Sequence, residues 1–262
     1  MKQKIVQVDA FTERVFGGNP AAVCIMDQWL PDTVMQHIAE ENNLAETAFA
    51  VKNETGYELR WFTPETEVDL CGHATMATAH TLFEHYGHPN HTIRFFSPRS
   101  GDLRVERESD GRLTLDFPTD AIVEIEPITA ITEAIGLIPL QTFKGKTDYM
   151  LIYDHQHEIE ALTPNFHLLD QLDCRGVIVT APGNEVDFVS RFFAPQCGIP
   201  EDPVTGSAHT TLVPFWSKKL QKALLSAKQL SKRGGALSCE YLGERVKISG
   251  RAVTYMTGEI HL

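Results

Sequence analysis

The alternation of apolar and polar residues predicts a chain rich in β-strands. Ile5–Phe11 alternates in the manner of a half-buried strand, and the turn Gly17–Pro20 separates it from an apolar strand over Ala21–Met26. Pro31 and Asp32 are typical of a helix start, and this helix is expected to end near residues 42–43. The first half is further predicted to hold strands over residues 44–51, 92–96, 103–107 and 113–117.

A helix of a different kind is predicted to begin at Gly72. The run Ala74–Ala79 has small or apolar side chains on every side. A helix that is apolar all round is buried, whereas a surface helix keeps one polar face. The sequence therefore predicts a central helix enclosed by the strands of the first half.

The second half repeats this order. Strands are expected over residues 149–153, 176–180, 188–193, 243–248 and 252–256, with a helix from Gly206 that Pro214 should kink or shorten. An amphipathic surface helix is expected over residues 218–229. The predicted fold class is α/β (α+β), with a mostly antiparallel sheet around one helix in each half. Pro118–Asp120 marks the boundary between halves 1–117 and 118–251, and residues 252–262 are expected to return to the first half.

One short motif occurs once in each half. The first copy is Phe62–Pro64 followed by Asp69–Ala74, and the second is Phe193–Pro195 followed by Asp202–His209. Each leads from an apolar strand to a carboxylate, a glycine and a run of helix formers. Because a helix N-terminus offers free backbone N–H groups and a positive dipole end, the two starts suit an anion. This pattern points to an enzyme that acts on a small carboxylate.

The charge and composition exclude several classes. The net charge of -12 argues against nucleic acid as a partner, because phosphate binding needs clustered lysine and arginine. No apolar run is long enough to span a membrane. The five cysteines form no CxxC pair, so a reducing, cytoplasmic location is expected.

Glu46 is the first candidate for chemistry. It lies among apolar and small residues, where an unpaired carboxylate is costly and a proton shuttle becomes effective. The alternative is a carboxylate at a strand end that points to water. The pattern alone favours neither.

Further candidates stand at the two helix starts. The dipole next to Gly72 should favour the neutral form of His73, which suits proton transfer, although His73 could also face solvent. Asp202 is either a catalytic carboxylate or an N-terminal cap. Ser207 is either a hydrogen-bond donor to a ligand or a small packing residue.

Cys71 adds a thiol to the first helix start. A thiolate would be stabilised there, but a small buried apolar residue is the better interpretation. The second start has Val204 and Thr205 at the matching positions, and no cysteine. Asn19, in the turn before the second strand, is a further candidate.

Metal and nucleotide sites have little support. His80, His85, His88 and His91 are loosely spaced, and a helix end that carries histidines explains them better than a metal cluster. The acidic run Glu65–Asp69 could bind calcium, although a solvated face fits better. GxGxxG, Walker and GxSxG motifs are absent.

Together these segments resemble the PhzF-like family, the phenazine-biosynthesis isomerase group related to diaminopimelate epimerase and proline racemase. The resemblance covers essentially the whole chain. It rests on Val8–Thr12, Phe16–Val23, Glu46–Phe49, Leu70–Thr75, Arg191–Pro195, Glu201–His209 and Gly250–Val253.

The resemblance implies two pseudo-symmetric domains, each a barrel-like sheet around a central helix, with the active site between them. It implies frequent homodimers and no cofactor or metal. It also implies that Glu46 moves a proton between carbons, that His73 and Asp202 assist, and that Ser207 positions the substrate. Backbone amides at Gly72 and Gly206 would hold the substrate carboxylate.

Two departures from the family pattern bear on the substrate. Ala45 stands where family members often have serine, and the second half is short for the family. The expected function is a cofactor-independent isomerase that acts on a small carboxylic acid. The alternatives are a racemase or epimerase of a small amino or imino acid, and a non-catalytic ligand-binding or interaction homologue.

Overall fold

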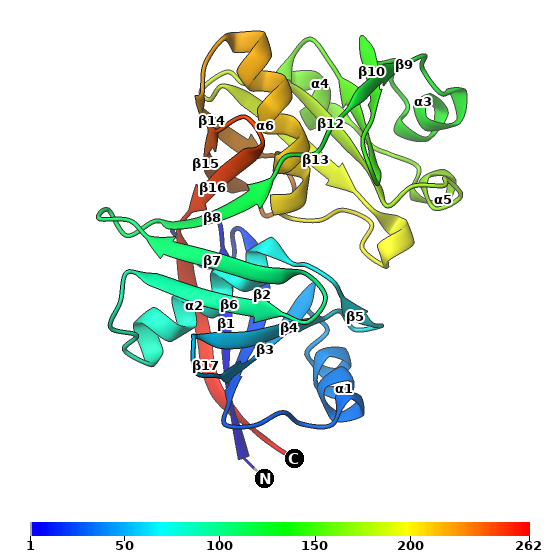
Figure 1. Ribbon diagram of the computed structural model, residues 1–262. Helices are drawn as coiled ribbons and strands as arrows, with labels where there is room; N and C mark the ends of the chain where they lie inside the picture. Colours follow the sequence, from blue (N-terminus) through cyan, green and yellow to red (C-terminus); the bar gives the residue numbers. More distant parts are fainter. Residues whose placement is uncertain (1) are drawn as a thin grey trace. The chain divides into compact units, whose positions relative to one another are not determined.

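The computed structural model describes residues 2–262 and divides the chain into two compact units. The first contains the chain up to Asp116 together with Ser249–Leu262, and the second contains Phe117–Ile248. Both units combine β-sheet with helices, so the predicted mixed α/β class is confirmed (Figure 1).

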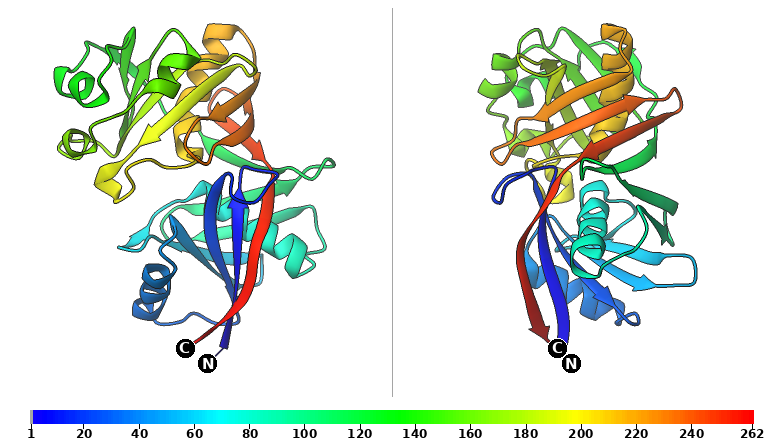
Figure 2. Two further views of the ribbon diagram at one scale, coloured as in Figure 1. Left: turned by 180° about the vertical axis from the view of Figure 1, so that it is seen from behind. Right: turned by 90° about the vertical axis from the view of Figure 1, so that its left-hand side faces the viewer.

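The first unit combines one sheet with two helices, α1 and α2. Its elements are β1 (Lys2–Ala10), β2 (Asn19–Met26), α1 (Asp32–Asn42), β3 (Glu46–Lys52), β4 (Tyr57–Phe62), β5 (Glu67–Val68), α2 (Gly72–His85), β6 (Thr92–Ser97), β7 (Gly101–Arg107), β8 (Leu113–Pro118) and β17 (Ala252–His261). Strands pair in the order β17–β1–β2–β3–β4–β6–β7–β8, with β5 on β4. The pairs β2–β3 and β4–β6 are parallel. The first and last strands lie side by side (Figures 1 and 2).

Helix α2 is buried as its sequence predicts. Residues 73–79 are all buried, and the helix packs against β1, β2 and β3. Helix α1 packs Met35 and Ile38 onto Cys24 and Phe49. A strand with small or apolar residues on both faces, such as β2, is what this two-sided packing requires.

The second unit also combines a sheet with helices, but its strands and helices follow one another in a different order along the chain. Its elements are β9 (Val123–Ile125), α3 (Thr129–Ile135), β10 (Gln141–Lys144), β11 (Asp148–Ile152), α4 (Gln156–Ala161), α5 (Phe166–Leu169), β12 (Gly176–Pro182), β13 (Phe188–Phe193), the 3₁₀ turn η1 (Pro195–Cys197), α6 (Gly206–Leu220), β14 (Leu224–Gln229), β15 (Gly235–Tyr241) and β16 (Arg245–Gly250). The strands pair in the order β9–β10–β11–β12–β13–β14–β15, and β11–β12 and β13–β14 are parallel.

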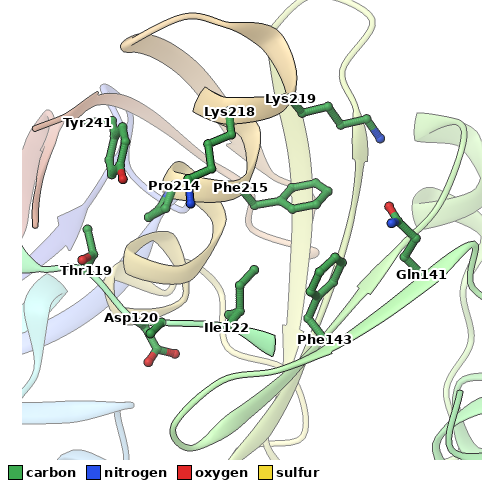
Figure 3. Close-up of a pocket in the computed structure, with 11 residues that line it drawn as sticks. Thr119, Asp120, Ile122, Gln141, Phe143, Pro214, Phe215, Lys218, Lys219 and Tyr241 are labelled. Carbon is green, nitrogen blue, oxygen red and sulfur yellow. The ribbon is translucent and has the colours of Figure 1, made fainter. Parts of the chain in front are cut away.

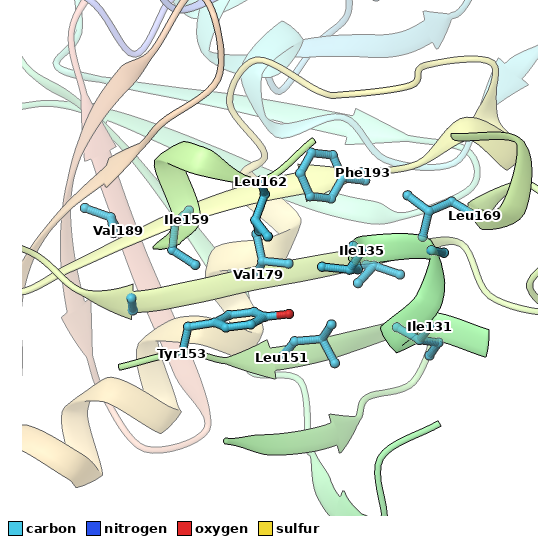
Figure 4. Close-up of a cluster of buried hydrophobic side chains, with 13 residues drawn as sticks. Ile131, Ile135, Leu151, Tyr153, Ile159, Leu162, Leu169, Val179, Val189 and Phe193 are labelled. Atoms are coloured by element: carbon cyan, nitrogen blue, oxygen red, sulfur yellow. The ribbon is translucent and has the colours of Figure 1, made fainter. Parts of the chain in front are cut away.

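Apolar side chains fill both faces of this sheet. On one face the short helices α3, α4 and α5 cover a cluster that includes Leu151, Val179 and Phe193 (Figure 4). In α6, Trp216 is fully buried and stacks on Phe188 with ring centroids 5.7 Å apart. Burial of such large rings makes α6 the central helix of this unit.

One prediction about the second unit is wrong, and another is narrowed. Helix α6 continues through Pro214 to Leu220, so Pro214 does not end it. Residues 218–229 are not one helix, because the chain adopts the left-handed conformation at Gln221 and then forms β14. Leu225 and Ala227 are buried while Leu224 and Ser226 are exposed, which is the period of a strand.

Candidate functional site

Glu46 is placed by the parallel pairing of β2 and β3. It is the first residue of β3, opposite Ala21 of β2. The carboxyl side chain is 13% exposed and is directed at His73, near the start of α2. The structure therefore favours the buried Glu46 over a carboxylate that points to water.

The contact between Glu46 and His73 is close but poorly aligned. Glu46 Oε2 lies 3.0 Å from His73 Nε2, and both side chains are largely buried. Within residues 2–262, this oxygen has no hydrogen-bond partner with acceptable geometry. Buried polar atoms without a partner are rare in folded proteins, and a catalytic role can account for one.

His73 is held from its other side by Asn19. The Asn19 side-chain nitrogen lies 3.1 Å from His73 Nδ1. In a neutral ring this amide can donate to Nδ1, and Nε2, which faces Glu46, then carries the proton. In a charged ring Nδ1 is itself a donor, and the amide oxygen of Asn19 must face it instead. Asn19 thus lies at the site and orients the imidazole.

The protonation of His73 differs from the sequence prediction. Burial lowers the pKa of His73, but the adjacent Cys71 and Glu46 outweigh burial and raise this pKa well above its ordinary value. The helix dipole was expected to favour the neutral ring. The neighbouring Cys71 and Glu46 side chains, both in contact with the buried ring, have the larger effect.

Cys71 is a buried thiol in this structure. Burial, followed by the charge of Glu46, raises the pKa of Cys71 to about 11, although His73 acts in the opposite direction. Stabilisation of a thiolate by the helix start is therefore contradicted. The alternative, a small buried apolar residue, fits.

The three side chains at this site lie close enough to suggest a metal. Among residues 2–262 they form the group of Glu, Cys and His ligand atoms that lie within 4.8 Å of one another. However, Cys71 Sγ is 3.5 Å from His73 Nδ1 and 4.0 Å from Nε2. A sulfur almost equidistant from both nitrogens lies beside the ring and not along either lone pair, so the arrangement does not fit shared metal ligation. Neither the four loosely spaced histidines nor the acidic run form such a group among these residues.

The start of α2 lacks a side-chain cap. Cys71 occupies the N-cap position and makes no capping hydrogen bond with its side chain. Among residues 2–262, the first backbone N–H groups of α2 therefore make no hydrogen bond to the N-cap side chain, and a helix start provides them with no intrahelical acceptor. This is the geometry that was predicted to suit a carboxylate.

In the second unit, hydrogen bonds of Thr205 and Gln229 hold Asp202 just before the start of α6. Thr205 donates its hydroxyl to Asp202 Oδ2 at 2.5 Å, and its backbone N–H donates to Gln229 Oε1 at 2.9 Å. The Gln229 amide also donates to the Asp202 carbonyl at 2.8 Å. Asp202 is not the N-cap, because Thr205 holds that position and has no capping side-chain bond. The capping interpretation of Asp202 is therefore wrong.

Ser207 lies in the first turn of α6 and contacts a residue that the sequence pattern did not single out. Arg175 donates from Nη1 to Ser207 Oγ at 3.0 Å. The same guanidinium donates to Asp148, which is 3% exposed. Burial lowers the pKa of Arg175, but Asp148 outweighs it and raises this pKa. In the sequence, the only signal was that Asp148 and Arg175 each stand directly before a predicted strand.

A cavity in the second unit lies away from these residues. About 720 Å³ in volume, it lies between the last turns of α6 and the strand β10 (Figure 3). Phe143 and Phe215 form its aromatic wall, and Lys218 and Lys219 reach its rim. None of the predicted site residues lines this cavity.

Comparison with known proteins identifies the family. The sequence profile of the family described as "Phenazine biosynthesis-like protein" (PhzC-PhzF) matches residues 8–258. This chain belongs to the PhzC-PhzF family. A similar relative is an uncharacterized isomerase of Pseudomonas aeruginosa, 50% identical over 262 residues and matched over the full length of both chains.

Solved structures of the PhzC-PhzF family have the same fold. A PhzF-family protein from Enterococcus faecalis matches with a TM-score of 0.96 and 47% identity, and the match covers all of both chains. A hydroxyproline epimerase from Agrobacterium vitis, crystallised with trans-4-hydroxy-L-proline, matches with a TM-score of 0.61 and 11% identity over 100% of this chain and 93% of that one. The second likeness concerns the fold alone.

The comparisons confirm the resemblance found in the sequence and support an isomerase as the enzyme class. Among residues 2–262, no helix is both long enough and apolar enough to cross a bilayer.

Proposed function

We propose that this PhzC-PhzF protein is a cofactor-independent isomerase that moves a proton within a small carboxylic acid, with Glu46 as the acid and base. The observation that carries the proposal is the buried Glu46 oxygen, 3.0 Å from His73 and without an aligned donor. A base needs an oxygen lone pair that no hydrogen bond occupies, and Glu46 has one beside an uncapped helix start.

The proposed reaction is a balanced proton shift. Ionised Glu46 removes a proton from a substrate carbon, and the electron pair of that C–H bond passes into the conjugated acid. Glu46 then returns the proton to a different carbon, so that a double bond moves and no atom is gained or lost. The ring of His73 lies at contact distance from the Glu46 carboxyl group before and after the step.

The substrate carboxylate is proposed to interact with helix-start amides at Gly72 and Gly206 and with the hydroxyl of Ser207. Uncapped starts on both α2 and α6 support this assignment. Asp202 is proposed as a second proton-transfer group. Its side chain is held by Thr205, which supports a defined orientation.

A two-thiol epimerase has less support. The raised pKa of Cys71 keeps its sulfur protonated, and Val204 and Thr205 occupy the corresponding second helix start. An epimerase that uses Glu46 with Asp202 or Cys71 stays open. In that reaction one group removes the proton and the other returns a proton to the opposite face of the same carbon.

The test is proton exchange in D₂O with a panel of small cyclic and amino-bearing carboxylic acids, followed by NMR and mass spectrometry. We expect deuterium at a carbon of at least one acid, loss of this exchange in Glu46→Gln, and its retention in Cys71→Ser. Loss in Cys71→Ser with retention in Glu46→Gln would instead assign the chemistry to the thiol. Binding without exchange in the wild type would support a non-catalytic homologue.

A homodimer and a cytoplasmic location are also proposed, on the family resemblance and the free cysteines respectively. Light scattering of the purified chain at micromolar concentration tests the first. Fractionation of the producing cells tests the second.

A further inference from the structure

An arginine is held rigidly against the start of α6. Arg175 directly precedes β12, and Asp148 is the first residue of β11, the parallel neighbour of β12. This pairing brings the two charges together. We propose that Arg175 is a positioning residue that makes the Ser207 hydroxyl a hydrogen-bond donor to the substrate carboxylate, an inference that rests on the function proposed above.

The guanidinium is fixed in its plane and in its direction. Asp148 accepts from both Nε and Nη2 of Arg175, and the ring of Phe192 lies under the guanidinium carbon at 5.3 Å. Because the fork of arginine is planar and rigid, fixing two donors on Asp148 fixes the direction of Nη1. That remaining nitrogen is the one that reaches Ser207 Oγ at 3.0 Å.

The direction of this hydrogen bond decides what Ser207 can do. Arginine is a donor only, so the Ser207 oxygen must accept from it. The hydroxyl hydrogen is then directed elsewhere, and within residues 2–262 no acceptor is assigned to it. Ser207 is therefore prepared to donate to an incoming oxygen at the first turn of α6.

The charges at this place agree with an anionic ligand. The start of a helix is the positive end of its dipole, where a cation is unfavourable and an anion is favourable. Arg175 stands there nevertheless, with Asp148 as its direct counter-ion. A bound carboxylate would meet a hydroxyl donor and a guanidinium whose charge is already balanced by Asp148. Its binding would therefore depend on the direction of the hydrogen bond from Ser207 as well as on charge.

A matched pair of probes measures this preference. 2-Aminobenzoate carries a carboxylate, and 2-aminobenzamide replaces one acceptor oxygen by a donor NH₂ group. We expect calorimetry or NMR titration to show that the wild-type protein binds the acid at least tenfold more tightly than the amide. Ser207→Ala should weaken binding of the acid about tenfold, because a hydrogen bond to a charged group is lost.

The contribution of Arg175 is tested without a change of net charge. In the double variant Arg175→Met with Asp148→Asn, both charges are removed, and no buried carboxylate is left unpaired. The Ser207 hydroxyl can then occupy any of its three staggered orientations, so binding of the acid should weaken about threefold. If this variant folds poorly, as judged by its melting curve, Arg175→Lys keeps the charge, loses the fixed fork, and should show the same loss.

A double-mutant cycle separates positioning from a structural role. When Ser207→Ala is already present, the Arg175→Met and Asp148→Asn changes should weaken the acid no further. A further loss in that background would overturn the inference, because Arg175 would then act by a route other than Ser207. Unchanged binding of the acid in the Arg175 variants would also overturn it.

These results are distinguishable from failure of the proposed function. If the wild-type protein binds the acid and the amide equally well, the carboxylate assignment is contradicted and the inference fails with it. If the wild type prefers the acid and Ser207→Ala removes this preference while the Arg175 variants do not, only the inference fails. Proton exchange by Glu46 is measured separately and does not depend on this cycle.

Discussion

At the scale of single residues, the central feature is the coupled pair of Glu46 and His73. Their side chains meet 3.0 Å apart in a buried site, so the charge on one depends on the charge on the other. Asn19 contacts the far side of the imidazole ring and limits its rotation. The pair therefore brings a carboxyl group and an imidazole to contact distance, and both groups are capable of proton transfer.

The first prediction concerns the titration of His73. Its pKa is raised above 6.5, so the charged ring stabilises the fold at pH values below 6.5, and this contribution is lost as the pH rises through the raised value. Glu46→Gln removes the carboxylate, and burial should then lower the pKa of His73. Long-range ¹H–¹⁵N NMR of the histidine side chains measures both values.

Cys71→Ser tests the other side chain that raises the pKa of His73. It leaves the Glu46 carboxylate in place but removes the sulfur, so the pKa of His73 should fall from its wild-type value in this variant as well. A wild-type His73 that titrates below 6.5, or one that Glu46→Gln does not change, would contradict the coupling.

At the scale of elements, a tight turn fixes the approach to β2. Gly18 has a φ of +60°, and a Cβ atom at this position would collide with the carbonyl oxygen of Ala10. The backbone of Ala10 cannot move aside as a flexible side chain would. This turn sets the place of Asn19, the residue that contacts His73.

The second prediction compares two glycines with the same backbone conformation. Gly87 has a φ of +61° and open space around it, so Gly87→Ala should cost only about 1 kcal/mol. Gly18→Ala adds the clash with Ala10 and should lower the free energy of unfolding by more than about 3 kcal/mol. Urea denaturation of both variants measures the difference, and equal losses would show that the turn relaxes.

Patterns along the sequence predict elements well where packing and local preference agree. Helix α2 is buried on every side, and its run of small residues indicated this directly. Residues 224–229 were predicted to belong to an amphipathic surface helix over 218–229, and they form β14 instead. The strand period there becomes apparent only when β14 pairs with β15, a contact between segments about ten residues apart.

Some of the candidate site residues could be predicted from the sequence, whereas others come together only through contacts between distant segments. Glu46, His73 and Asp202 stand out because charged residues interrupt apolar or helix-start patterns. Arg175 and Asp148 lie 27 residues apart and meet only through the parallel pairing of β11 and β12. The protonation of His73 was also missed, since it depends on the contact with Glu46 and not on the helix alone.

At the scale of the whole molecule, buried neutral histidines should make stability depend on pH. His209 in α6 is fully buried, and burial lowers its pKa to about 4, although its hydrogen bond with the Thr205 carbonyl opposes this. In the unfolded chain the same group titrates near 6.5. Between these values the unfolded chain binds more protons than the folded one, so stability falls as the pH is lowered.

The third prediction follows from this difference. Lowering the pH from 7 to 5 should reduce the free energy of unfolding by about 2 kcal/mol through His209 alone. His209→Gln has no titrating group there, so its unfolding free energy should change less over the same interval. Urea denaturation at both pH values measures this, and parallel curves for the two proteins would contradict the assignment.

Glu46 is the residue on which the proposed isomerase depends, and the most direct measurement is the rate of proton exchange between a bound carboxylic acid and D₂O. With the acid that the wild-type protein exchanges fastest, Glu46→Gln is predicted to lower this rate by about 10²- to 10⁴-fold while the protein still binds the acid. Exchange by Glu46→Gln at the wild-type rate would contradict the central claim.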